Sequence, residues 1–175
     1  MNYIFSAIFL YFFLGFLLFI FQRRIIFNKS GHPGKPKDYN LDYTEEVYIK
    51  TEDNLDLLSW YHKGDNSHPL LVYFHGNSFH IGDRAYRIEK YIEENWSVLL
   101  VSWRGFGGNK GNPTEKNLYK DAEAVLKWIK NNTEFKFKEL VIYGESLGSG
   151  AAVEMGTRYE FLSIVLEAPF TSIND

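Results

Sequence analysis

Residues 143–148 read YGESLG. It follows a short apolar run at residues 140–143 and precedes residues 147–159, whose small and apolar side chains favour a helix. A G-x-S-x-G sequence between a buried strand and a helix is typical of a sharp turn that strains the backbone of its serine. Bulky side chains two residues before or after the serine would clash there, which explains the two glycines. Ser146 is therefore a candidate nucleophile.

Strands and helices alternate on both sides of this turn. Buried strands are predicted at residues 70–74, 97–103, 140–143 and 163–166, and helices at residues 84–94, after Thr114, and at residues 147–159. Thr114 is the expected N-cap of its helix, whose apolar face holds Leu118, Ala122, Val125, Leu126 and Ile129. Two more polar strands, at residues 46–50 and 55–61, can form an antiparallel edge. This alternation indicates right-handed crossovers and an α/β fold with a mostly parallel sheet.

Acyl transfer also needs backbone N–H groups that hold the developing oxyanion. One predicted donor is the N–H of Leu147, directly after the nucleophile. The other is expected from the loop after the first central strand, where Asn77 is the candidate and His75 is expected to brace the loop. Each such donor typically stabilises the transition state by about 3 kcal/mol. The simpler interpretations are a capping serine and an ordinary strand-exit turn, and the strand–turn–helix order favours catalysis.

Composition argues against several other functions. The chain has 19 Lys and Arg against 22 Asp and Glu, so it has no basic footprint for nucleic acid. It has no cysteine, which excludes disulfides, thiolate catalysis and cysteine-ligated zinc. No metal or cofactor is expected, because His75 and His80 lack the spacing of a metal pair and the glycines at 105, 107, 108 and 111 do not open a helix. Those glycines indicate a flexible loop, which Arg104 is expected to hold.

The first 22 residues are predicted to be a transmembrane anchor. Residues 3–21 contain no charge, and a helix of that length spans about 28 Å, close to the hydrocarbon thickness of a bilayer. A cleaved signal peptide is an alternative, but the run lacks a basic start and a small-residue cleavage site. A buried core helix is the other alternative. Residues 23–43, with several glycines and prolines, are interpreted as a juxtamembrane linker, and residues 44–175 as the globular domain.

Cations follow the apolar run and none precedes it. They are Arg23, Arg24, Lys29, Lys35 and Lys37. By the positive-inside rule, this asymmetry predicts a cytoplasmic globular domain on a single span. The same side chains can rest on anionic headgroups of the lipid bilayer, or simply belong to a solvated linker.

Taken together, these motifs resemble the α/β-hydrolase superfamily. The similarity is to its single-pass, membrane-anchored serine hydrolases, which include acyl-thioesterase-like and lysophospholipase-like members. It rests on the apolar N-terminal run, FHGN at residues 74–77, WRGFGGNKGNPTE at residues 103–115, YGESLG, and EAPFTSI at residues 167–173. The resemblance covers residues 40–173 and implies hydrolysis of esters or thioesters of a small-molecule or lipidated acyl substrate.

The triad is where the sequence departs from that pattern. The expected chain order is serine, then aspartate or glutamate, then histidine. All five histidines, at 32, 62, 68, 75 and 80, precede Ser146, and the only later aspartate is Asp175. The resemblance therefore implies a C-terminally truncated domain without the acid and base. His80 is an alternative base, although a loop histidine without a catalytic role is the preferred interpretation.

Two hypotheses follow. In the first, the chain is a serine hydrolase scaffold whose acid and histidine come from a separately encoded C-terminal fragment. In the second, it is an inactive hydrolase remnant or a membrane-tethered binding protein. In both, strand 163–166 is expected to be left as an unpaired apolar edge, and the chain alone to be marginally stable.

Overall fold

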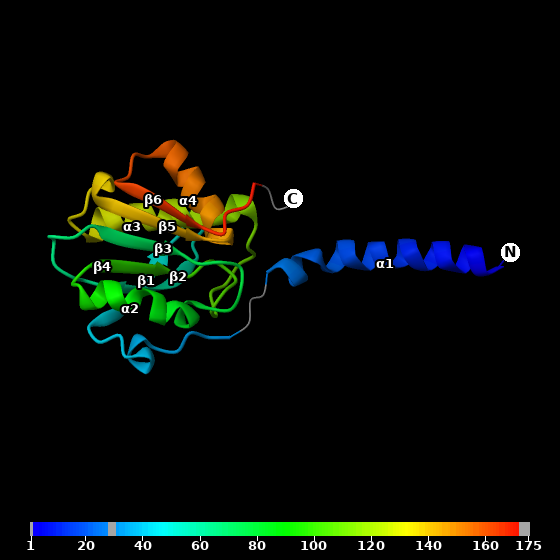
Figure 1. Ribbon diagram of the computed structural model, residues 1–175, viewed down its shortest axis with the longest axis horizontal. Helices are drawn as coiled ribbons and strands as arrows, with labels where there is room; N and C mark the ends of the chain where they lie inside the picture. Colours follow the sequence, from blue (N-terminus) through cyan, green and yellow to red (C-terminus); the bar gives the residue numbers. More distant parts are fainter. Residues whose placement is uncertain (1, 28–30, 172–175) are drawn as a thin grey trace.

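Six strands form one sheet in the order β1-β2-β4-β3-β5-β6 in the computed structural model, which describes residues 2–27 and 31–171 (Figure 1). The strands are β1 Thr44–Lys50, β2 Asp56–His62, β3 Leu70–Phe74, β4 Ser97–Val101, β5 Leu140–Glu145 and β6 Ser163–Glu167. The last four run parallel, whereas β1 pairs with β2, and β2 with β4, in antiparallel fashion. This arrangement confirms the predicted α/β fold and its antiparallel edge.

Helices cover the two faces of the sheet unequally (Figure 1). Helix α2, Ala85–Glu93, lies on one face with the short 3-10 helix η2, Ile81–Arg84, before it. Helices α3, Glu115–Asn132, and α4, Leu147–Arg158, lie on the other face. The short 3-10 helix η3, Phe137–Glu139, connects α3 to β5. Because β3 and β4 are covered on both faces, every residue of these two strands is buried, as the continuous apolar runs predict.

Helix α3 forms as its sequence predicts. The Thr114 hydroxyl accepts a hydrogen bond from the Asn117 N–H at 3.2 Å, which is the expected N-cap. The predicted apolar face is buried against the sheet: Leu118, Ala122, Val125, Leu126 and Ile129. Its periodicity alone was sufficient to place this helix.

Strand β6 corrects one prediction. Residues 163–166 form a strand, but an exposed one and not a buried one. Ile164, Val165 and Leu166 are 37–39% exposed, because β6 is the outermost strand beyond β5. Apolar composition predicted a covered strand, whereas exposure depends on the neighbours that the sheet supplies. Within the described residues, β6 pairs on one side alone, so the expected unpaired apolar edge is present.

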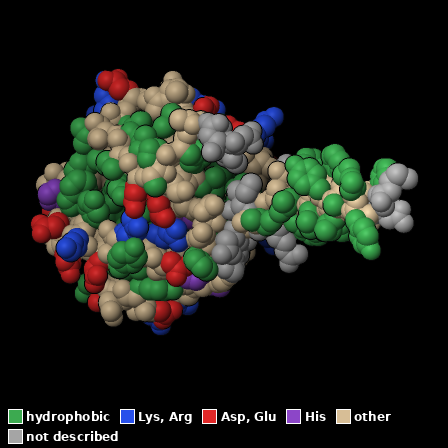
Figure 2. All heavy atoms as spheres, turned by 45° about the vertical axis from the view of Figure 1, so that its right-hand side comes forward, with side chains coloured by type: hydrophobic (Ala, Val, Ile, Leu, Met, Phe, Trp, Pro, Cys, Tyr) green, Lys and Arg blue, Asp and Glu red, His purple; other side chains and the backbone are tan. Residues whose placement is uncertain are grey.

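Helix α1, Asn2–Ile26, projects away from the sheet (Figure 1). Its residues Tyr3–Gln22 are long and apolar enough to cross a membrane, and none of that stretch is buried by the rest of the chain. Apolar side chains cover this projection, whereas side chains of both charges are mixed over the domain (Figure 2).

The segment after α1 packs on the domain. Phe27 is buried, and its ring lies 6.4 Å from that of Phe106. The 3-10 helix η1, Pro36–Tyr39, follows, with Tyr39 5.4 Å from Trp60 and Leu41 in the same core. The sequence of this region is typical of a linker, because it contains several glycines and prolines. The residues that pack on the domain are isolated aromatic and apolar ones, and they form no periodic pattern that would indicate burial.

Candidate active site

Ser146 occupies a sharp turn between β5 and α4. Its backbone has φ 46° and ψ −112°, a strained conformation for a residue with a side chain. The Ser146 N–H donates to the Glu167 carbonyl at 2.8 Å. Its own carbonyl accepts from the Ser149 N–H at 2.8 Å and from the Ser149 hydroxyl at 2.6 Å. Bonds from β6 and α4 therefore hold the strained turn on both sides.

The glycines beside Ser146 are sterically required, as predicted. A Cβ on Gly144 would lie 2.6 Å from Cα of Ser149. A Cβ on Gly148 would lie 2.0 Å from the Phe74 carbonyl oxygen, well inside van der Waals contact. Gly148 thus lets the first turn of α4 lie directly against the end of β3.

The Leu147 N–H opens helix α4. Among the described residues, no carbonyl outside the helix accepts it, and residues at a helix start have no partner four positions back. The positive end of the helix dipole adds to the field of this N–H. The geometry is therefore suitable for holding an anion next to Ser146, and the role of Leu147 as oxyanion donor stays a prediction.

His75 fixes the loop after β3. Its Nδ1–H donates to the Gly76 carbonyl at 2.6 Å, so its Nε2 is the acceptor for the Trp103 N–H at 3.4 Å. The Trp103 indole N–H donates to the His75 carbonyl at 2.8 Å. Burial, and then the nearby Arg84 charge, lower the pKa of His75 to about 3, so the ring is neutral. The expected bracing role of His75 is confirmed.

The same loop lies against the sharp turn at residues 144–148 that carries Ser146, which we call the elbow. A Cβ on Gly76 would come 2.9 Å from Oε1 and 3.5 Å from the carbonyl oxygen of Glu145. Asn77, the next residue, is half-buried. The structure therefore brings the segment that carries Asn77 beside the segment that carries Ser146, and the Asn77 N–H as second oxyanion donor stays a prediction.

Arg84 ties these two segments together. Its Nε and Nη2 donate to the two carboxylate oxygens of Glu145 at 3.1 and 2.8 Å. Its Nη1 donates to the Ser78 carbonyl at 2.8 Å. Burial alone would raise the pKa of Glu145, but the hydrogen bonds and charge of Arg84 outweigh it and lower that pKa. The Glu145 carboxylate is therefore occupied by Arg84 and is not a base for Ser146 in this arrangement.

A second arginine–glutamate pair stands beside the first. Arg87 donates to Glu167 at 2.6 Å, and the Tyr143 hydroxyl donates to the same oxygen at 2.8 Å. Tyr73 donates to Glu145 at 3.0 Å and stacks on Tyr143 with ring centroids 4.7 Å apart. Sequence reasoning missed both pairs. The one signal in the sequence was that β3 and β5 each carry a tyrosine, and these two residues, Tyr73 and Tyr143, are paired in register.

The five histidines make their contacts elsewhere. They are His32 with the Gly34 N–H, His62 with the Thr44 hydroxyl, His68 stacked on Trp96, His75 with Trp103, and His80 with Asp83. His80 Nδ1 lies 3.1 Å from an Asp83 carboxylate oxygen, and its ring lies against Gly31. Within the described ranges, no group of three or more His, Cys, Asp or Glu could hold a metal ion.

The glycine-rich loop is held from inside the domain. Arg104 is 2% exposed and donates to Asp121 through its backbone N–H and its Nε, at 3.0 and 2.8 Å. Its remaining nitrogens donate to Asp53 at 2.7 and 3.0 Å. Asn109 joins this loop to β2 by accepting from the Leu58 N–H at 2.9 Å. Arg104 therefore holds the loop, as expected, and its donors are already used.

The fold and the sequence match those of known hydrolases. The profile of the family described as serine aminopeptidase, S33, matches residues 65–175. The chain belongs to this family of α/β-hydrolases. A crystal structure of the Pyrococcus furiosus esterase Pf2001 superposes with a TM-score of 0.68 and 28% identity, over 81% of this chain and 58% of the esterase.

Two curated relatives extend the match to the N-terminal region. The uncharacterized protein Rv2307c of Mycobacterium tuberculosis is 34% identical over 166 residues, which are 91% of this chain and 58% of that protein. Lysophosphatidylserine lipase ABHD12 of Danio rerio is 28% identical over 81% of this chain and 43% of its own length. The chain thus spans about half the length of the curated relatives that it matches.

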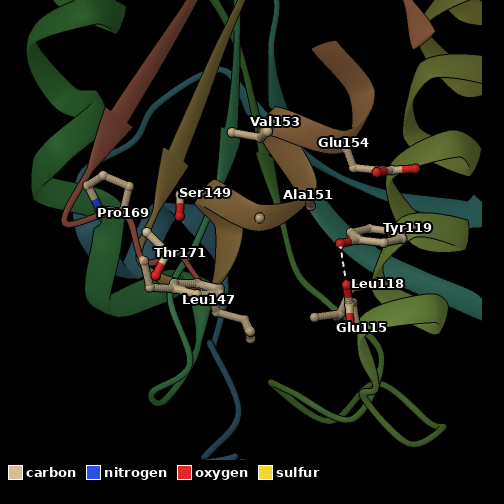
Figure 3. Close-up of a pocket in the computed structure, with 12 residues that line it drawn as sticks. Glu115, Leu118, Tyr119, Leu147, Ser149, Ala151, Val153, Glu154, Pro169 and Thr171 are labelled. Atoms are coloured by element: carbon tan, nitrogen blue, oxygen red, sulfur yellow. Dashed lines mark hydrogen bonds between the residues drawn. The ribbon is translucent and has the colours of Figure 1, made fainter. Parts of the chain in front are cut away.

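One cavity of this α/β-hydrolase lies beside the elbow (Figure 3). It measures about 310 Å³ and is bounded by α3, α4 and residues 169–171. Leu147 lines it and Ser146 does not, while on the α3 side the Tyr119 hydroxyl donates to Glu115 at 2.8 Å. Leu147 follows β5 and residues 169–171 follow β6, so the cavity lies at the carboxyl ends of these strands, where ligands of open α/β sheets bind.

Proposed function

We propose that this chain carries the nucleophile of a membrane-anchored serine hydrolase that cleaves ester or thioester bonds of lipidic acyl substrates. The observation that carries the proposal is the strained backbone of Ser146, at φ 46° between β5 and α4. Strain of this kind is retained at functional sites when the surrounding structure enforces it. Here the close approach of α4 to β3 and β5, which the absent side chains of Gly144 and Gly148 permit, is part of the structure that encloses the turn.

In the proposed reaction, Ser146 Oγ attacks the substrate carbonyl carbon while its proton passes to a general base. The carbonyl oxygen becomes an oxyanion held by the N–H groups of Leu147 and Asn77. The carbon–oxygen or carbon–sulfur bond then breaks, and the alcohol or thiol leaves with that proton. Water, deprotonated by the same base, hydrolyses the acyl-serine and restores the hydroxyl.

The base and its acid partner are proposed to come from polypeptide beyond these 175 residues, such as a separately encoded C-terminal fragment. The five histidines support this, since each has a partner other than Ser146. Without a base, a serine triad loses on the order of 10⁶ in turnover. The chain by itself is therefore expected to be nearly inactive.

A lipidic substrate and a bilayer location are proposed together. Tyr3–Gln22 forms an apolar helix of membrane-spanning length, and one relative is called a lysophosphatidylserine lipase. We propose that this helix anchors the chain, with the globular domain in the cytoplasm because the cations follow the span.

The engaged histidines also favour a second candidate, a membrane-tethered binding protein without catalysis. The two are separated by assaying membranes of the source cells for hydrolysis of long-chain acyl thioesters and lysophospholipids, with and without a chromosomal Ser146→Ala change. The hydrolase proposal expects a loss of one activity on this change. Identical activities on both substrate classes would favour the binding protein.

A further inference from the structure

The segment that leaves α1 packs on the two loops beside the candidate nucleophile. Phe27 contacts Phe106, whose ring lies 5.3 Å from that of His75. A Cβ on Gly31 would lie 2.6 Å from the His80 ring, so the chain passes directly over the loop that contains Asn77. Both loops follow the carboxyl ends of parallel strands, β3 and β4.

The connection between the apolar helix and this packing is short. The membrane-length stretch ends at Gln22, α1 continues to Ile26, and Phe27 is already buried in the domain. The four helical residues after Gln22 rise about 6 Å, which is comparable to the headgroup layer on one side of a bilayer. Helix α1 leaves the domain on the side toward which β3, β5 and β6 point (Figure 1). A bilayer around α1 therefore faces the carboxyl ends of these strands.

Phe79 is an exposed aromatic side chain on that side. It lies two residues after Asn77, is 50% exposed, and has φ 60°, an unfavourable conformation for a bulky residue. Its neighbours fix it there, because the Ser78 carbonyl accepts from Arg84 and the His80 N–H donates to Asp83. A strained loop that holds an apolar ring in solvent suits contact with an apolar phase.

We propose that helix α1 holds the mouth of the candidate active site, formed by the loops after β3 and β4, against the bilayer surface. Phe79 then lies in the lipid interface, and an acyl substrate reaches Ser146 from the lipid phase. The delivery of substrate rests on the proposed function, whereas the contact of the mouth with lipid does not.

The chain has no cysteine, so one substitution creates a unique labelling position. The full chain with Phe79→Cys carries an environment-sensitive fluorophore and is reconstituted in vesicles of phosphatidylcholine and phosphatidylglycerol that contain nitroxide-labelled lipid. The matched control is Glu160→Cys, whose side chain is 76% exposed just before β6, at the amino ends of the parallel strands. Both labels are measured in the Ser146→Ala background, so no result depends on catalysis.

The label at position 79 is expected to lose most of its fluorescence to the lipid quencher, and the label at position 160 to keep it. A flexible Gly/Ser insertion of about ten residues between Gln22 and Phe27, which spans on the order of 17 Å, is expected to abolish the quenching at position 79. Equal quenching at the two positions, or quenching at position 79 that survives the insertion, would overturn the proposal. Either result leaves the reactivity of Ser146 a separate question.

Discussion

The Arg84 guanidinium donates to both carboxylate oxygens of Glu145, at 3.1 and 2.8 Å, while its third nitrogen donates to the Ser78 carbonyl at 2.8 Å. Glu145 directly precedes Ser146, and Ser78 directly follows Asn77. One side chain therefore sets the spacing between the nucleophile turn and the loop of the second expected oxyanion donor. The side chains of Arg84 and Glu145 are 10% and 14% exposed, so solvent screens the pair only slightly.

Removing one partner of this pair should be costly. We expect Arg84→Met to lower the free energy of unfolding by about 3 kcal/mol, because it leaves the Glu145 carboxylate buried without its cation. Adding Glu145→Gln should recover part of that loss, which urea titrations of the full chain in detergent micelles can measure. The exposed Arg158→Met change is the control, and it should cost much less, because solvent screens the ion pairs of this side chain. Strictly additive losses for Arg84→Met and Glu145→Gln would mean that the two side chains are not coupled.

Two glycines of helix α4 offer a matched test of the elbow. Gly148→Ala would place a methyl carbon 2.0 Å from the Phe74 carbonyl oxygen, whereas at Gly150 the nearest atom, Cζ of Phe170, is 3.4 Å away. We expect Gly148→Ala to destabilise the chain by about 3 kcal/mol through overpacking. Gly150→Ala should be neutral, or stabilising by up to about 1 kcal/mol, through helix propensity. Comparable thermal midpoints for the two variants would contradict the close approach of α4 to β3.

Buried His75 should make stability depend on pH. Its pKa is about 3 in the folded chain and about 6.5 when unfolded, so between these values the unfolded chain binds more protons. Stability is then complete above about pH 6.5 and falls toward pH 3, by up to about 1.4 kcal/mol per pH unit from this group. Burial lowers the pKa of His62 as well and acts in the same direction. The test therefore compares the free energy of unfolding against pH for the native chain and for His75→Gln, which should show the shallower slope. Parallel slopes for the two chains would exclude a buried neutral His75.

Exposed edge strand β6 should promote association. Val165 is 39% exposed on this edge, and unpaired apolar edges recruit other strands. We expect Val165→Lys to reduce the concentration-dependent growth of the full chain in micelles, followed by light scattering. Tyr48→Lys changes an exposed side chain on β1 at the opposite edge and should have a smaller effect. If both substitutions reduce association equally, the added charge explains the result and the β6 edge does not.

The sequence was sufficient to predict what depends on local patterns. Ser146 and its two glycines were recognisable because one turn geometry requires all three residues. Thr114 and the apolar face of α3 followed from capping and helical period. Strand β6 was assigned correctly as a strand with an unpaired edge, but the burial expected for its side chains is absent, because burial is a property of the neighbouring elements.

The contacts between distant segments could not be predicted. Arg84 and Glu145 are 61 positions apart, and no periodic pattern connects them. Phe27 looked like part of a linker, because a single aromatic residue among polar ones carries no period, yet it packs on Phe106. Such pairs become visible once the strand order has placed the loops after β3, β4 and β5 at one end of the sheet.

The central claim is that Ser146 is a reactive nucleophile, and covalent labelling tests it most directly. Membranes of the source cells are treated with a fluorophosphonate, and the adduct is located by mass spectrometry on the tryptic peptide between Lys138 and Arg158. Ser149→Ala is the control, because that serine shares the peptide and its hydroxyl is bonded to the Ser146 carbonyl. The account predicts an adduct on Ser146 that persists in Ser149→Ala and disappears in Ser146→Ala. An unmodified Ser146, in membranes where other serine hydrolases react, would contradict it.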